Sequence, residues 1–132
     1  MSLAIFKNEP PFIDFLGIEI VSRGENEVVG RLPFRPELQN RKGDVHGGAI
    51  ASLLDTVLGA AARAGLETGS VSTTLSLTVN YVSPGRGDLR CTARCTKKGR
   101  SIRFLQGEVL DGDNELVATA VATFKVFRAK TT

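Results

Sequence analysis

The amino-acid sequence predicts an α+β fold in which one antiparallel sheet curls around a single central helix. The segment from residue 49 to about residue 65 is rich in Ala and Leu, lacks proline and is apolar on nearly every side. These properties are typical of a core helix, which other elements must cover. Two short extended segments precede it and four follow, so a sheet built of consecutive hairpins supplies that cover.

The segments before the helix are short. Residues 12–16 follow two prolines and are expected to form a helical turn or a flap that ends at Gly17. Residues 18–23 and 27–32 flank a Gly-Glu-Asn turn and therefore predict a two-stranded hairpin. Polar residues and prolines then predict a loop over residues 33–45.

Four strands are predicted after the helix. Residues 75–81 alternate strictly between apolar and polar side chains, which is typical of a strand with one buried face. Residues 89–95 repeat the alternation, and residues 101–110 and 116–127 complete the set. Lys-Gly-Arg and Asp-Gly-Asp-Asn sequences separate the last three strands and favour tight turns.

Length and composition limit the class of protein. A chain of 132 residues with 42% apolar side chains fits one domain over residues 1–132. The longest nearly apolar stretch, residues 49–64, is shorter than the roughly 20 residues of a membrane span. No secretion signal is recognisable at the N-terminus, so the expected location is cytoplasmic, with no membrane partner.

Net charge limits the kinds of binding partner, and cysteine and histidine content limits the possible disulfides and metal sites. The net charge of +3 favours anionic partners, but one Tyr and no Trp argue against nucleic acid. Cys91 and Cys95 fall four residues apart on a predicted strand, about 13 Å and too far for a disulfide. With one histidine in the chain, a metal site is not expected, nor is any other cofactor. Both thiols are expected to be buried in packing.

The sequence His46-Gly47-Gly48 runs directly into the predicted helix. The first amides of a helix lack intrahelical acceptors and carry partial positive charge, so this end suits an anionic oxygen. If that oxygen belongs to a carbonyl that becomes tetrahedral, amides aimed at it would accelerate the reaction. The alternative is a tight turn from loop to helix with a packed histidine.

Asp55 is a carboxylate inside the predicted core helix. An unpaired carboxylate is costly to bury, so such a residue is usually paired, protonated or functional. We therefore predict a catalytic acid-base role for Asp55. The alternative is that Asp55 reaches solvent or forms a local hydrogen bond with Ser52 or Thr56.

Spacing along the helix predicts a homodimer. Asp55 lies seven residues beyond Gly48, or about 10 Å along the axis, so it cannot reach a carbonyl held at its own helix start. A two-fold partner with an antiparallel helix would place each Asp55 opposite the glycine amides of the other subunit. The active site should therefore lie across the subunit interface.

A basic run is a candidate site for phosphate groups. It comprises Lys97, Lys98, Gly99 and Arg100, with Ser101 completing the turn and Arg103 beyond it. Three arginines precede the run: Arg86, Arg90 and Arg94. Phosphates suit such charges, although a run of this kind also forms solvated surfaces.

The ordered set Asn40, His46-Gly47-Gly48 and Asp55 resembles the hotdog-fold thioesterases of the phenylacetyl-coenzyme A thioesterase type. The resemblance runs from about Phe12 to the C-terminus and includes Tyr81-Val82-Ser83-Pro84, Gly99-Arg100-Ser101 and Leu116-Val117-Ala118. It implies a hotdog fold and hydrolysis of an acyl-coenzyme A by a homodimer or a tetramer.

The resemblance also implies roles for individual residues. The amides of Gly47 and Gly48 would polarise the thioester carbonyl, with support from His46. Asp55 would be the nucleophile or the base for a water, and Asn40 and Thr74 would help to place that water or the carboxylate. Phe12, Phe15 and Leu16 would form either a lid over the acyl group or ordinary core packing.

Two other functions remain open from the sequence. A hydratase or dehydratase of the same fold also needs a His and a carboxylate near an acyl thioester. The glycines that follow His46, without a proline-rich continuation, argue against that enzyme. A non-catalytic acyl-coenzyme A sensor is the other alternative, but a pure binding module gains nothing obvious from a buried Asp55.

Overall fold

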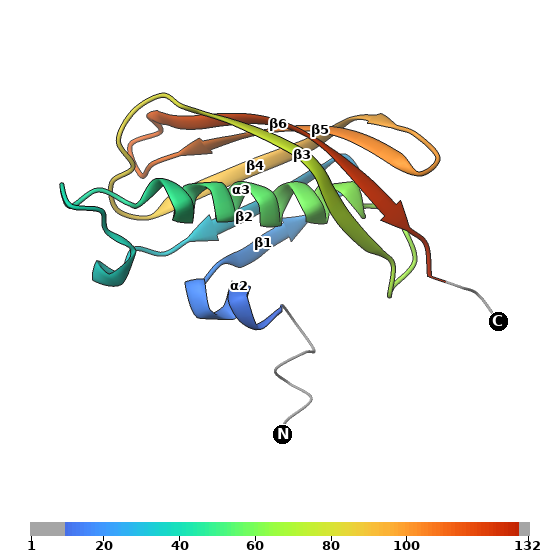
Figure 1. Ribbon diagram of the computed structural model, residues 1–132, viewed down its shortest axis with the longest axis horizontal. Helices are drawn as coiled ribbons and strands as arrows, with labels where there is room; N and C mark the ends of the chain where they lie inside the picture. Colours follow the sequence, from blue (N-terminus) through green and yellow to red (C-terminus); the bar gives the residue numbers. More distant parts are fainter. Residues whose placement is uncertain (1–9, 130–132) are drawn as a thin grey trace, which may run out of the picture.

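A computed structural model describes residues 10–129 of the chain (Figure 1). In order, its elements are α2 (Pro11–Leu16), β1 (Glu19–Arg23), β2 (Glu27–Leu32), the 3-10 turn η1 (Pro36–Leu38), α3 (Gly47–Ala62), β3 (Val71–Tyr81), β4 (Leu89–Lys98), β5 (Ile102–Leu110) and β6 (Leu116–Phe127). The predicted order of two short strands, one long helix and four strands is confirmed.

The six strands form one antiparallel sheet in the order β1-β2-β4-β5-β6-β3. Helix α3 lies along one face of this curved sheet, and the short α2 lies beyond β1 (Figure 1). Strand β3 pairs with β6 instead of with its neighbour in sequence, β4, so it becomes an edge of the sheet. The α+β architecture with one central helix is therefore confirmed.

The core lies between α3 and the sheet. Leu53, Leu54, Val57 and Leu58 of α3 have no exposed surface, which confirms the prediction of a core helix. Gly30 of β2 permits the close approach, because a Cβ added there would lie 2.5 Å from Cγ2 of Val57. A larger residue at this position would push the helix away from the sheet.

One face of α3 is nevertheless open, which corrects the expectation of cover on every side. Gly48 is exposed, and Ala51, Ser52, Asp55 and Thr56 are half-buried. Residues four apart share a helix face, so these five residues form one stripe that the sheet does not cover. We call it the open stripe.

Strand β3 also differs from its prediction. It begins at Val71, four residues earlier than expected, and its pairing with β6 shifts between Thr74 and Ser76. Leu75 occupies this bulge and is 54% exposed, so its predicted place on the buried face is wrong. A bulge inserts one extra residue and interrupts the alternation of faces.

The two cysteines have different environments. Cys91 is buried, as predicted, whereas Cys95 is half-buried and its thiol lies 3.4 Å from the carbonyl oxygen of Lys97. Burial raises the pKa of the Cys91 thiol to about 12, and the nearby Glu108 carboxylate adds to this shift. Cys91 is thus a packing residue and not a nucleophile.

Among residues 10–129, no group of three or more His, Cys, Asp or Glu side chains is arranged to hold a metal ion. No helix over the same residues is long and apolar enough to cross a membrane.

Candidate active site

The start of α3 is organised by His46. This residue is the N-cap of the helix, and its Nδ1 accepts a hydrogen bond of 2.8 Å from the N–H of Gly48. Gly47 is the first helical residue, and an N–H at that position has no acceptor within its own helix. Of the two predicted carbonyl donors, Gly48 therefore has an acceptor within the chain, and Gly47 is the candidate for the substrate.

Tyr81 lies in a segment that carries the resemblance, but no role was predicted for its side chain. Its hydroxyl donates to the Gly47 carbonyl at 2.8 Å. Its ring lies 3.4 Å from the point where a Cβ on Gly47 would stand. The contact joins the end of β3 to the start of α3 across 34 residues, a separation that no local sequence signal reports.

Asn40 lies in the loop before α3, where it shapes a turn. Its Oδ1 accepts from the backbone N–H groups of Lys42 at 2.9 Å and Asp44 at 3.1 Å. These bonds fix the orientation of the side-chain amide and leave its NH₂ group as the donor end. His46 N in turn donates to Leu38 O at 2.7 Å, which ties the loop to the helix start.

Asp55 lies on the open stripe, and its Oδ1 accepts a hydrogen bond of 2.6 Å from Thr74 Oγ1 on β3. Neither local partner considered from the sequence is used. Ser52 Oγ donates to Gly48 O at 2.9 Å and Thr56 Oγ1 donates to Ser52 O at 2.7 Å. The carboxylate at mid-helix is thus oriented from the sheet, and Thr74 is its partner.

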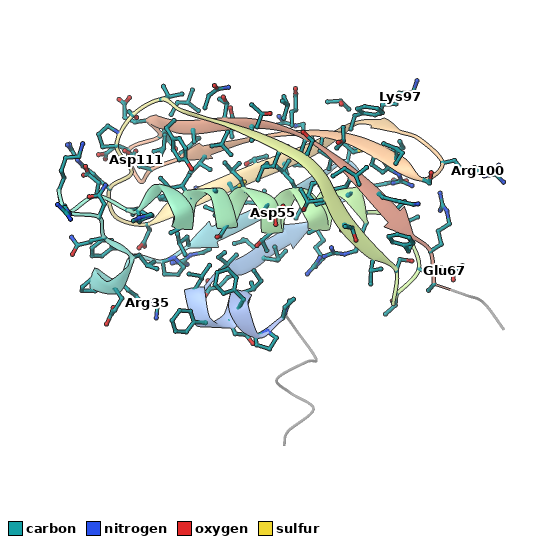
Figure 2. The ribbon with its side chains drawn as sticks, in the orientation of Figure 1. Arg35, Asp55, Glu67, Lys97, Arg100 and Asp111 are labelled. Carbon is teal, nitrogen blue, oxygen red and sulfur yellow. The ribbon has the colours of Figure 1, made fainter. Side chains whose placement is uncertain are left out.

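Within one chain the structure forms two separate groups of candidate residues. His46, Gly47 and Gly48 gather at the helix start. Asp55 pairs with Thr74 and lies near the middle of α3 (Figure 2). Asp55 follows Gly47 by eight residues, which is about 12 Å along the helix axis. One chain therefore does not bring the carboxylate to the carbonyl-binding end.

The candidate residues for coenzyme A also fall into two groups. Lys97 and Arg100 lie at the tip of the β4–β5 hairpin, toward the end of the molecule where α3 finishes (Figure 2). Lys98 Nζ donates there to Glu25 O at 3.1 Å. Arg86, by contrast, pairs with Asp44 at 3.3 Å beside the loop that carries Asn40. The length of α3 separates the two groups.

Arg103 is not a surface cation, which corrects its place in the predicted basic set. Its side chain is 5% exposed. Nε donates to Gly99 O at 3.2 Å and Nη1 donates to Ala62 O at 3.3 Å. Ala62 is the last residue of α3, so the guanidinium satisfies a terminal carbonyl and opposes the negative end of the helix dipole.

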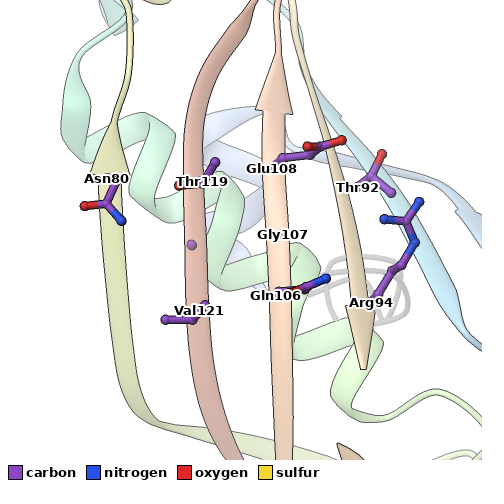
Figure 3. Close-up of a pocket in the computed structure, with 9 residues that line it drawn as sticks. Asn80, Thr92, Arg94, Gln106, Gly107, Glu108, Thr119 and Val121 are labelled. Carbon is purple, nitrogen blue, oxygen red and sulfur yellow. The ribbon is translucent and has the colours of Figure 1, made fainter. Parts of the chain in front are cut away.

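A pocket of about 250 Å³ lies on the face of the sheet opposite α3 (Figure 3). Most of its lining side chains are polar and come from β3 to β6: Asn80, Thr92, Arg94, Gln106, Glu108 and Thr119, with Val121 as an apolar member. These residues alternate along their strands with residues that face the core, such as Ala93 and Val109. None of the candidate catalytic residues lines it.

Known proteins resemble this chain in sequence and in fold. Residues 42–118 match the model of the Thioesterase superfamily, a range that includes the helix start, Asp55 and Thr74. A relative named as an esterase in Halobacterium salinarum is 32% identical over 127 residues, covering 88% of this chain and 84% of the relative.

Two solved structures share the fold. A conserved protein of Pseudomonas aeruginosa has a TM-score of 0.85 and 34% identity, covering 90% of this chain and 95% of that one. Protein BH2602 of Bacillus halodurans, solved with CoA, has a TM-score of 0.80 and 31% identity, covering 94% of this chain and 80% of that one. The hotdog fold that the sequence implied is confirmed.

Proposed function

Because the chain belongs to the thioesterase superfamily and is a thioester hydrolase, we propose that its substrate is an acyl-coenzyme A with a small aromatic or medium-chain acyl group. The observation that carries the proposal is the hydrogen bond of 2.6 Å from Thr74 to Asp55, which holds a carboxylate on the open stripe of α3. The CoA-bound structure of BH2602 supports coenzyme A as the leaving group.

The chemistry follows from the two groups of residues. Asp55 removes a proton from a water whose oxygen attacks the thioester carbon, or attacks that carbon itself through a carboxylate oxygen. The oxyanion accepts from the N–H of Gly47, with the Asn40 amide as a second donor. When a water attacks, the carbon–sulfur bond then breaks, the acid is released, and the proton taken up by Asp55 passes to the coenzyme A thiolate. When Asp55 attacks, the thiolate leaves a mixed anhydride of Asp55 and the acyl group. A water then hydrolyses this anhydride, which releases the acid, restores the carboxylate and supplies the proton to the thiolate.

A second copy of the chain completes this site in our proposal. An antiparallel partner helix against the open stripe would bring its Gly47 to the level of Asp55. The hydroxyls of Ser52 and Thr56 already donate to carbonyls of their own helix, so covering them leaves no donor unsatisfied. Strand β3 supports the same pairing, because it is an edge strand of 11 residues.

The antiparallel arrangement also unites the two groups of basic residues. The start of one α3 lies level with the middle of the other, so Arg86 of one chain and the Lys97–Ser101 turn of the other occupy the same end of the dimer. The coenzyme A phosphates would then bind at a positively charged entrance to the site. It is formed by Lys97, Arg100, Arg86 and the amides of Gly99 and Ser101. Lys98 stiffens the turn through its bond to Glu25 O.

The acyl group is proposed to lie beneath α2. Phe12 and Phe15 are 59% and 71% exposed on this short helix, which leaves two aromatic faces without cover. Arg35 Nη2 donates to Phe15 O at 2.8 Å and so ties the end of α2 to the loop that carries Asn40. Aromatic rings held beside the site favour flat or apolar acyl groups.

The catalytic role of Asp55 is tested with Asp55→Asn. We expect kcat for release of free thiol from a panel of acyl-coenzyme A esters to fall by at least about a hundredfold, or 2.7 kcal/mol, with binding retained. The control is Asp113→Asn, an exposed aspartate in the β5–β6 turn. Equal rates for Asp55→Asn and the wild type would reject the role, and binding without thiol release in the wild type would reject the substrate class.

The carbonyl donor is tested with a proline. Gly47 is the first helical residue, a position where proline is tolerated, and His46 at φ −58° and ψ 137° has the extended backbone that precedes proline. Gly47→Pro therefore deletes the N–H and keeps the helix. The matched control, Gly47→Ala, adds a Cβ in ordinary contact with Tyr81 and keeps the N–H. We expect kcat to fall about a hundredfold for proline only; a similar loss for alanine would indicate a steric cause.

A further inference from the structure

The peptide bond between Gly47 and Gly48 is held at both of its polar ends. Its carbonyl accepts from the Tyr81 hydroxyl at 2.8 Å, and its N–H donates to His46 Nδ1 at 2.8 Å. Hydrogen bonds at the two ends of a peptide group polarise it in the same direction and strengthen one another. The hydroxyl, the peptide and the imidazole thus form one continuous chain from β3 to the first turn of α3.

This chain determines where His46 carries its proton. A nitrogen that accepts a hydrogen bond carries no hydrogen, so a neutral imidazole that accepts through Nδ1 has its proton on Nε2. Nε2 lies on the opposite side of the ring from Nδ1 and points away from Gly48. His46 is an exposed residue, so this N–H is accessible to a ligand at the helix start.

We propose that Tyr81 is a positioning residue that acts through the Gly47–Gly48 peptide to hold His46 as a neutral hydrogen-bond donor with its proton on Nε2. His46 then donates a hydrogen bond from Nε2 to the thioester, beside the Gly47 N–H. Asp55 is the only base of the site. The inference rests on the proposed function, because its target is the thioester bound at the start of α3.

The Tyr81 ring supports the same role. It packs against Gly47 at 3.4 Å from the position of a Cβ, so the residue contacts the donor glycine with its ring and the peptide carbonyl with its hydroxyl. The ring fixes the distance between β3 and the helix start, and the hydroxyl fixes the rotation of the peptide plane. Removing the hydroxyl alone separates the two effects.

The first test needs no substrate. His46 is the only histidine of the chain, so a long-range ¹H–¹⁵N spectrum shows one imidazole pattern. In wild-type protein under conditions where the ring is neutral, we expect an unprotonated Nδ1 and a protonated Nε2. A protonated Nδ1 in that neutral ring would overturn the inference, whatever the activity of the enzyme.

The second test uses Tyr81→Phe, which keeps the ring. We expect the two ring nitrogens to move toward averaged resonances, the Gly48 amide to exchange faster with solvent, and kcat to fall about tenfold at unchanged KM. The control is Ser83→Ala, which removes a hydroxyl bond of 2.6 Å to Leu116 O just beyond β3. That variant should keep the wild-type imidazole pattern and kcat.

The inference and the proposed function fail separately. A Tyr81→Phe variant with the wild-type imidazole pattern and the wild-type kcat would overturn the role of Tyr81 while leaving the hydrolase intact. A wild-type protein that releases thiol from no acyl-coenzyme A would contradict the proposed substrate. The nitrogen resonances of Tyr81→Phe would still decide whether the tyrosine sets the tautomer.

Discussion

At the scale of residues, the Thr74 hydroxyl orients the carboxylate of Asp55, the proposed catalytic residue. It donates to one oxygen of Asp55 and leaves the other oxygen available for a water or a carbonyl carbon. Thr74→Val keeps the branched shape that suits a strand and removes the donor. We expect kcat to fall about tenfold, since one hydrogen bond to a charged group is lost.

The matched variant is Thr74→Ser, which keeps the hydroxyl and should retain most of the activity. The coupling is checked in the Asp55→Asn background, where Thr74→Val should change kcat little because its partner no longer carries charge. A tenfold loss that persists in that background would show that Thr74 acts independently of Asp55.

At the scale of elements, the close packing of α3 against the sheet depends on Gly30. A Cβ there would stand 2.5 Å from Val57 Cγ2 and 3.2 Å from the carbonyl oxygen of Glu19, which is backbone and cannot swing aside. Gly30→Ala should therefore lower the free energy of unfolding by about 1–3 kcal/mol. Urea denaturation measures this change.

Gly112 offers the control for this comparison. It lies in the turn before β6, and a Cβ added there meets nothing within 4 Å. Gly112→Ala should leave the free energy of unfolding within about 0.5 kcal/mol of the wild type. Equal midpoints for the two variants would mean that the helix shifts without cost.

Two arginines of one hairpin illustrate the difference between a structural and a binding cation. Arg103 donates to Ala62 O at the end of α3, so Arg103→Met should lower the free energy of unfolding by about 1–3 kcal/mol through an unsatisfied carbonyl. The exposed Arg100 is proposed to contact phosphate, so Arg100→Met should raise KM about fivefold, as expected for about 1 kcal/mol, at unchanged stability. Interchanged effects would contradict both assignments.

For the whole molecule, the decisive question is whether the active site is shared between chains. Asp55→Asn and Gly47→Pro subunits should each be nearly inactive alone. If each site takes Asp55 from one chain and Gly47 from the other, random mixing should restore about a quarter of the wild-type kcat, because half of the dimers contain one intact site of two. Co-expression with two tags and a thiol-release assay measures the recovery. Mixed dimers with no recovered activity would place each site within one chain.

The sequence was sufficient to predict the elements but not every contact between them. Alternation and turn residues located the strands, and the Ala-rich stretch located the helix, because these signals are local. The bulge at Leu75 and the burial of Arg103 depend on register and on the end of α3, which lie outside any local window. The contact between Tyr81 and Gly47 could not be predicted for the same reason. His46 was expected to support the carbonyl site, but its capping bond was not predicted, because histidine is uncommon as an N-cap.

The mid-helix position of Asp55 limits how two substrate molecules could enter the proposed dimer. In the proposed antiparallel dimer, the two reaction centres would be separated by about 12 Å along the helix axis, which is the rise from residue 47 to residue 55. Because coenzyme A is longer than this spacing, two substrate molecules would not fit through one entrance of the dimer. In that dimer they would enter from opposite ends, with their pantetheine arms pointing toward each other.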